Sequence, residues 1–123
     1  MCLFTNNKKA KTAKEDITVW KLFLTTSDGE LLSIIQQHKY AKGLQPEVGF
    51  SYGFKNRVYK TVERGYHAFT SLESAMNSSY IYDEIRECIV PNGAKYYTSD
   101  RVYSPTKSEI VANQIIIGHA VKI

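Results

Sequence analysis

The chain has 123 residues, of which 43% are hydrophobic and 23% charged, and its formal net charge is +4. This length fits one domain with its own core, and the composition excludes a disordered or fibrous protein. No apolar run approaches the roughly eighteen residues that a membrane span needs, so we expect no membrane partner.

The charge is concentrated near the start of the chain. Residues 1–16 contain four lysines and two acidic residues, which is half of the net charge, and we expect them to form a flexible polar and basic arm. Residues 17–123 are expected to form a single domain that is nearly neutral. Because a nucleic-acid-binding domain usually carries a basic stripe on its folded part, nucleic acid ranks lowest among the expected partners.

The cysteines and histidines indicate no metal site. Cys2 and Cys88 lie far apart and match no metal-binding spacing, and two free thiols are typical of a cytoplasmic protein. His38, His67 and His119 form no close pair of the H-x-x-x-H kind. Glycine-rich phosphate loops and nucleophile elbows are also missing from the sequence, so we expect no cofactor.

The first predicted element after the arm is a strand over residues 17–24, ITVWKLFL, which is β-branched and aromatic. Asp28 and Gly29 then favour a tight turn. Residues 30–37, ELLSIIQQ, fit a returning strand or a short helix, and the turn favours the strand. Residues 45–56 contain Pro46 and two glycines among aromatics, which predicts a loop that caps the core or borders a pocket.

Alternating residues in RVYKTVE, 57–63, predict a strand, and YHAF, 66–69, predicts a second one after a bend at Gly65. Thr70 and Glu73 then have the spacing of a capping box at the start of a helix. The apolar face of that helix is predicted to consist of residues at helical spacing: Leu72, Ala75, Met76 and Tyr80.

The second half of the chain is predicted to be mostly strand. EIRECIV, 84–90, alternates and stops at a turn of Pro91, Asn92 and Gly93. AKYYTS and RVYS, 94–99 and 101–104, are short strand candidates, and residues 109–123 hold one or two strands with a bend or bulge at Gly118. Together these elements predict an α+β fold, mostly antiparallel sheet with one firm helix, in a single compact domain.

Most of the chain resembles one group of proteins. MCLFTNNKKAKTAKEDITVWKLF, GYHAF and CIVPNGAKYY are similar to segments of small uncharacterised proteins encoded by gut anaerobes and their mobile elements. The resemblance implies a bacterial or phage protein of the cytoplasm, but it brings no activity with it.

A second resemblance is to the ADP-ribosyltransferases and implies a site. GYHAFTSLESA is similar to the segment in which that family places a glycine, an aromatic and a short strand before a serine–alanine helix, and the family's tyrosine stacks on the nicotinamide of NAD. Tyr66 holds that place here, beside His67. SEIVANQIII resembles the segment with the family's catalytic glutamate, which implies Glu109.

In this reading the carboxylate of Glu109 holds a ribose hydroxyl and stabilises an oxocarbenium-like transition state. The family's first strand carries a histidine or arginine that grips the adenosine ribose, where this chain has only Lys21. The resemblance therefore implies Glu109 and His67 as catalytic residues, Tyr66 and Lys21 as NAD-binding residues, and a split sheet of the ADP-ribosyltransferase kind.

Two functions follow. The first is a small cytoplasmic binding or accessory protein, a monomer or small oligomer linked to phage or mobile elements, whose partner is a protein or a small nucleotide. The alternative is an enzyme, or a degenerate relative of one, for which NAD or a nucleotide is the substrate. A cleft joining Tyr66, His67 and Glu109 favours the alternative, and an exposed apolar or aromatic patch favours the first. Because Tyr66 and His67 are adjacent in a strand, we expect only one of them to line a cleft.

Overall fold

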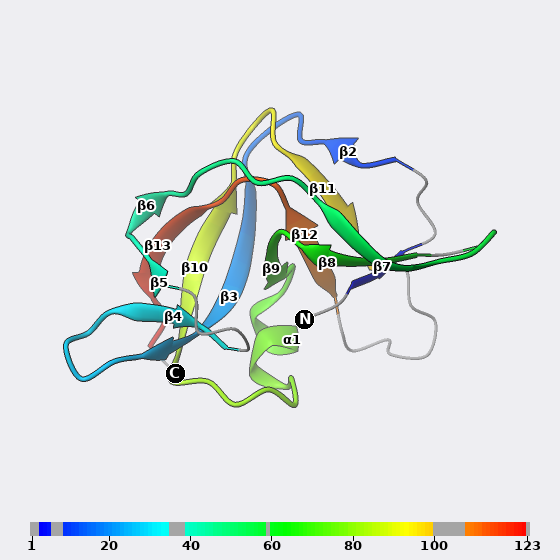
Figure 1. Cartoon of the computed structure of the whole chain (residues 1–123). Coiled ribbons are helices and arrows are strands. Elements are labelled where there is room, and N and C mark those ends of the chain that lie inside the picture. Colours follow the sequence, from blue (N-terminus) through cyan, green and yellow to red (C-terminus); the bar gives the residue numbers. More distant parts are fainter. Residues whose placement is uncertain (1–2, 6–8, 35–38, 59, 100–107, 123) are drawn as a thin grey trace.

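Figure 1 shows the computed structural model of the chain, which describes residues 3–5, 9–34, 39–58, 60–99 and 108–122. The strands in chain order are β1 (Leu3–Thr5), β2 (Lys11–Thr12), β3 (Ile17–Thr25), β4 (Leu31–Ser33), β5 (Lys39–Tyr40), β6 (Gly43–Leu44), β7 (Ser51–Lys55), β8 (Lys60–Arg64), β9 (Tyr66–Phe69), β10 (Glu84–Val90), β11 (Lys95–Thr98), β12 (Glu109–Ala112) and β13 (Ile116–Ala120). One helix, α1, spans Leu72–Met76. The protein is thus a compact, mostly antiparallel β domain, and the helical part of the α+β prediction amounts to five residues.

Most strands belong to one large sheet with the order β2-β11-β12-β9-β3-β10-β13-β6, and β4 and β5 are added beside β3. Its centre is the pair β3 and β10, which stay in register from Glu84 opposite Phe23 to Val90 opposite Ile17. Residues directly opposite each other share a face of the sheet. The apolar residues that alternate along both strands therefore reach both faces in matched pairs, such as Cys88 with Val19 and Ile85 with Leu22.

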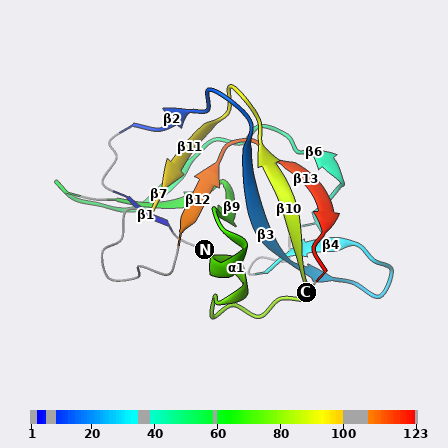
Figure 2. The same cartoon turned by 180° about the vertical axis from the view of Figure 1, so that it is seen from behind.

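The two faces of this sheet have separate cores. Val19, Phe23 and Ala68 belong to the larger core on one face. Leu22 and Phe69 belong to the core on the other face, which is covered in part by α1. Figure 2 shows α1 against β3 and β9 from behind.

A three-stranded sheet, β1-β8-β7, joins the large sheet at one side, and the β7–β8 hairpin extends away from the rest at the right of Figure 1. The two sheets share a small core that contains Leu3, Val62, Tyr97 and Val111. The prediction of a flexible arm is wrong for the described residues of 1–16. Leu3 is fully buried and β1 pairs with β8, because β8 has an open edge and an apolar side chain, Val62, that Leu3 covers.

Further along the arm, β2 pairs with β11, and Ala13 is buried in the larger core. The loop predicted over residues 45–56 is also wrong in part, since Ser51–Lys55 form β7. The glycine in this strand, Gly53, leaves room for the side chain of Glu63 on β8, so it permits the pairing instead of breaking it.

Several predicted strands are confirmed. YHAF and EIRECIV form β9 and β10 with the predicted bounds, and the pattern at residues 57–63 corresponds to β8. Residues 109–123 contain two strands, and the register between β10 and β13 shifts beside Gly118, where a side chain would meet the carbonyl of Glu87. The strand reading of residues 30–37 is confirmed over Leu31–Ser33. Cys2, residues 35–37 and the RVYS segment lie outside the described residues.

Candidate functional site

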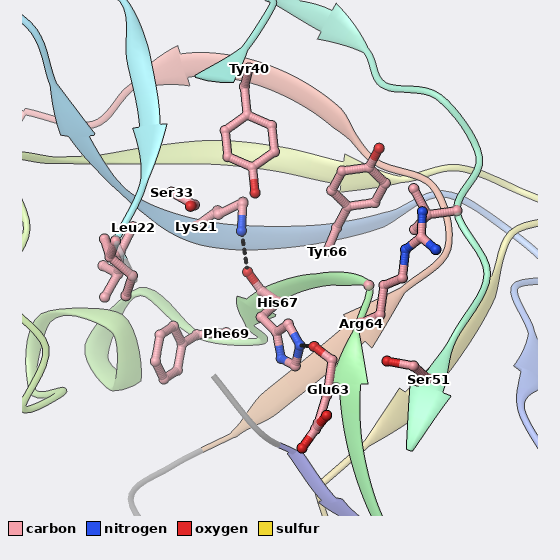
Figure 3. A pocket seen from close by; sticks show the side chains of 13 residues that line it. Lys21, Leu22, Ser33, Tyr40, Ser51, Glu63, Arg64, Tyr66, His67 and Phe69 are labelled. Carbon is pink, nitrogen blue, oxygen red and sulfur yellow. Dashed lines mark hydrogen bonds between the residues drawn. The ribbon is translucent and has the colours of Figure 1, made fainter. Parts of the chain in front are cut away.

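A pocket of about 480 Å³ lies where β9 separates from β3. The two strands pair at only one position, Trp20 with Phe69. The earlier residues of β9 therefore have no strand partner on the edge that faces β3. Side chains from β3, β4, β5, β7, β8 and β9 line the opening (Figure 3). The volume is in the range of small-molecule sites, and we call the cavity the Lys21 pocket.

Lys21 comes from the middle of β3 and is only 6% exposed. Its Nζ donates a hydrogen bond of 2.8 Å to the backbone carbonyl of His67, as the dashed line in Figure 3 shows. The side chain therefore takes the place of a strand at the open edge of β9. No carboxylate of a described residue forms an ion pair with Lys21.

Aromatic rings surround this ammonium. Its Nζ lies 5.3 Å from the ring centroid of Tyr40 and 5.7 Å from that of Phe23, at distances where the ring faces attract a cation. Burial lowers the pKa of Lys21 from its ordinary 10.5 to about 8, an effect that Cys88 partly opposes. Burial disfavours the charged form because the protein solvates it less well than water does.

His67 is 8% exposed, and its Nε2 lies 2.7 Å from the backbone carbonyl of Glu63. A carbonyl can only accept, so Nε2 carries the hydrogen and Nδ1 is the unprotonated nitrogen. Burial is the main reason that the pKa of His67 falls from 6.5 to about 3, and the positive charge of Lys21 contributes to the fall, while the bond to Glu63 opposes it. The imidazole is neutral at physiological pH, and its Nδ1 can accept a hydrogen bond but is only a weak base.

Two tyrosines form one wall of the pocket. The rings of Tyr40 and Tyr66 lie 6.3 Å apart between centroids, and the hydroxyl of Tyr66 donates to the carbonyl of Pro46 at 2.6 Å. Burial raises the pKa of Tyr40 to about 12, with a further contribution from Tyr66. Burial also raises the pKa of Tyr66, so both phenols are protonated at physiological pH. Figure 3 shows the hydroxyl of Tyr40 pointing toward Lys21.

The charges on the pocket wall are mixed. Arg64 is a second cation, and Glu63 is the carboxylate among the lining residues of the described chain. Both side chains are largely exposed, so water screens them, whereas Lys21 is buried. The buried part of the pocket is positive, and it is suited to a ligand that presents oxygen atoms to Lys21.

The pocket brings together three of the four residues implied by the sequence. Lys21, Tyr66 and His67 all line it. The expectation that only one of Tyr66 and His67 lines a cleft is wrong, because the pocket opens around the free edge of β9 and reaches both faces of the strand.

Glu109 is not among the lining residues. β12 pairs with β9 and places Glu109 opposite Phe69, so the two segments are neighbours as expected. Glu109 nevertheless lies one strand further from Lys21 than Phe69 does.

Sequence reasoning missed Tyr40 altogether. It is an isolated aromatic in a polar segment, and no periodic pattern there indicates that β5 folds back over β3 by way of β4. Ser33 and Arg64 also line the pocket, and no local pattern in the sequence indicates this either.

Comparisons with known proteins give no relative: no family model, no curated protein sequence and no solved structure matches this chain. Within the described part of the chain, no group of three or more histidine, cysteine, aspartate or glutamate residues is arranged to hold a metal ion. No helix among the described residues is long and apolar enough to cross a membrane.

Proposed function

We propose that this protein is a binding protein that takes a small molecule into the Lys21 pocket. The observation that carries the proposal is the buried Lys21 ammonium, which faces the pocket and has no carboxylate partner among the described residues. A buried cation without a counter-ion is costly to folding. A ligand with anionic or carbonyl oxygens offsets that cost when it binds.

The lining also specifies the body of the ligand. Tyr40, Tyr66 and Phe69 line the same pocket as Lys21 with flat apolar surfaces, while Arg64 supplies a second positive charge at the wall. Such a lining suits a planar or apolar group attached to an oxygen-rich head group. Aromatic carboxylates and nucleotides have this chemistry.

The same molecule also exposes large hydrophobic side chains on the β7–β8 hairpin. Tyr52 and Phe54 on β7 are about half exposed, and Val58 in the same hairpin is more exposed still. Exposed aromatics of this kind support an accessory role, in which a bacterial or phage protein of the cytoplasm binds a small ligand and a partner protein together.

A second candidate is an NAD-acting enzyme with an ADP-ribosyltransferase-like split sheet. Tyr66 and His67 line the pocket, and β12 brings Glu109 next to β9, which supports this reading. The position of Glu109 outside the lining is the reason that we rank binding first.

One experiment tests both candidates. Calorimetric titrations with phenylpyruvate, AMP and NAD are made on the wild type, on Lys21→Met and on the exposed control Lys42→Met. We expect at least one probe to bind the wild type and the control, and Lys21→Met to lose about tenfold or more in affinity, since one charge-assisted hydrogen bond contributes that much. Failure of all three probes, or equal binding by Lys21→Met, contradicts the proposal.

The NAD titrations are also assayed for free nicotinamide. Release by the wild type that is lost in Glu109→Gln supports the enzyme, and binding without release supports the binding protein.

A further inference from the structure

Lys21 differs from an ordinary lysine in the fraction of its side chain that is uncharged. With a pKa of about 8, about a quarter of its molecules carry the uncharged amine at pH 7.5, against about one in a thousand for a lysine near 10.4. The uncharged amine is the nucleophile. Lys21 also lines a cavity that can hold a small molecule, so a reaction partner can reach it.

The surroundings of the amine favour one reaction. Nζ is fixed by its bond to the His67 carbonyl, and no carboxylate from the described residues stabilises the ammonium. The hydroxyl of Tyr40 points toward Nζ in Figure 3, and its burial keeps it protonated. A free amine beside a hydroxyl donor is an arrangement that favours addition to a carbonyl group, because the donor polarises the carbonyl oxygen.

We propose that Lys21 condenses with the carbonyl group of a 2-oxo acid and holds it in the pocket as a reversible Schiff base. The inference rests on the proposed function, since it names the chemistry of the ligand at the same pocket. The keto carbon meets Lys21, and the side chain of the acid lies against Tyr40 and Tyr66, which line the same pocket.

The reaction balances without an oxidant or reductant. The lone pair of Nζ attacks the keto carbon and forms the C–N bond, while the π electrons of the carbonyl move to its oxygen. That oxygen takes up the proton which the nitrogen loses and gives a carbinolamine. The hydroxyl group then leaves as water with a second proton from the nitrogen, and the C=N bond forms. Addition of water reverses the sequence and releases the 2-oxo acid.

Tyr40 is a positioning residue and proton donor in this scheme. Its hydroxyl donates a hydrogen bond to the carbonyl oxygen as negative charge develops there. His67 cannot take this part because its low pKa leaves it neutral. Its backbone carbonyl, in contrast, keeps the amine in place.

The test uses phenylpyruvate with sodium cyanoborohydride, which reduces a Schiff base to a stable secondary amine. Peptide mapping by mass spectrometry then compares the adduct at Lys21 with the adducts at the exposed Lys42 and Lys122 of the same molecules. We expect at least about tenfold more adduct at Lys21 at pH 7.5, because it has the larger fraction of free amine. The yield at Lys21 should level off above pH 8, and Tyr40→Phe should slow it.

Lys21→Arg separates this inference from the proposed function, since arginine keeps the positive charge but forms no Schiff base. We expect Lys21→Arg to bind phenylpyruvate in calorimetry without trapping it, and thermal melting checks that the variant is folded. Binding by the wild type with no preference for Lys21 in trapping overturns the Schiff base and leaves the binding function standing. Absence of phenylpyruvate binding and of trapping in the wild type overturns the inference, and the other probes then decide the proposed function.

Discussion

Lys21 and His67 are two basic side chains that the fold holds where a positive charge is costly. They are linked through the backbone, since Lys21 donates to the carbonyl of His67 and His67 donates to the carbonyl of Glu63. Both hydrogen bonds satisfy carbonyls at or beside the open edge of β9. The pKa values of both residues are lowered mainly by burial. Burial therefore keeps His67 neutral and gives Lys21, which is still mainly an ammonium, an appreciable uncharged fraction, and the pocket acquires its chemistry from that.

The low pKa of His67 makes stability depend on pH. The unfolded chain takes up a proton below pH 6.5, whereas the folded protein does so only near pH 3. The contribution of His67 to stability is therefore complete above pH 6.5 and is lost as the pH falls toward 3, by about 1.4 kcal/mol per pH unit.

Urea unfolding of the wild type and of His67→Gln at pH 7.5, 5.5 and 4.5 measures this loss. Glutamine can donate to the Glu63 carbonyl but does not titrate, so the difference between the two proteins should change below pH 6.5 and stay constant above it. Parallel pH profiles would show that His67 titrates normally.

At the scale of the element, the start of α1 shows how pairing with a neighbouring strand moves the N-cap of a helix by one residue. The sequence predicts a cap at Thr70, but the cap is Ser71, whose side chain accepts a hydrogen bond from the backbone N–H of Ser74 at 3.1 Å. The backbone N–H of Thr70 donates instead to the carbonyl of Ser108, beside β12. Pairing of β9 with β12 thus continues one residue further than YHAF and moves the helix start by one.

This shift has a measurable consequence. Ser71→Ala should destabilise the protein by about 1 kcal/mol, because it removes the side chain that satisfies a free N–H of the first turn. Thr70→Ala is the matched control and should cost less, since its hydroxyl makes only a long bond of 3.4 Å to Ser108. Chemical denaturation of the two variants decides between the caps, and a larger loss in Thr70→Ala would restore Thr70 as the cap.

At the scale of the whole molecule, the first residues of the chain help to hold the two sheets together. Leu3 lies in the small core between the sheets, with Val62 from β8, Tyr97 from β11 and Val111 from β12. Two further contacts, β2 with β11 and Ala13 with the larger core, continue the attachment. These contacts join residues that are far apart in the chain, so their loss affects more than the N-terminus.

Deletion of residues 1–14 should therefore destabilise the protein strongly. Removal of a buried leucine side chain alone costs about 2–5 kcal/mol, which corresponds to a fall in melting temperature of about 8–19 °C for a domain of this size. Leu3→Ala should show much of this effect, and Lys11→Ala, at an exposed position, little of it. A deletion variant that melts within a few degrees of the wild type would show that the arm is dispensable after all.

The sequence by itself determined the local elements. The bounds of the strands YHAF and EIRECIV follow from the alternation of their residues and from the residues that end them. The turn at Asp28 and Gly29 follows from the positive φ of 81°, which glycine adopts without strain. The sequence also points to Lys21, Tyr66 and His67, through the resemblance of two segments to the ADP-ribosyltransferases. Alternation, caps and turns act between residues close in the chain, so a sequence read along its length reveals them.

Only the tertiary structure decided what these elements enclose. Tyr40 reaches Lys21 because β4 and β5 fold back beside β3, Leu3 is buried because β8 has an open edge, and Glu109 stays outside the pocket because β12 lies beyond β9. The low pKa of Lys21 depends on all the groups that bury it. Each of these features depends on contacts between segments that are distant in the chain. The free energy of such contacts comes from apolar surface that two segments bury together, so neither segment alone reveals it.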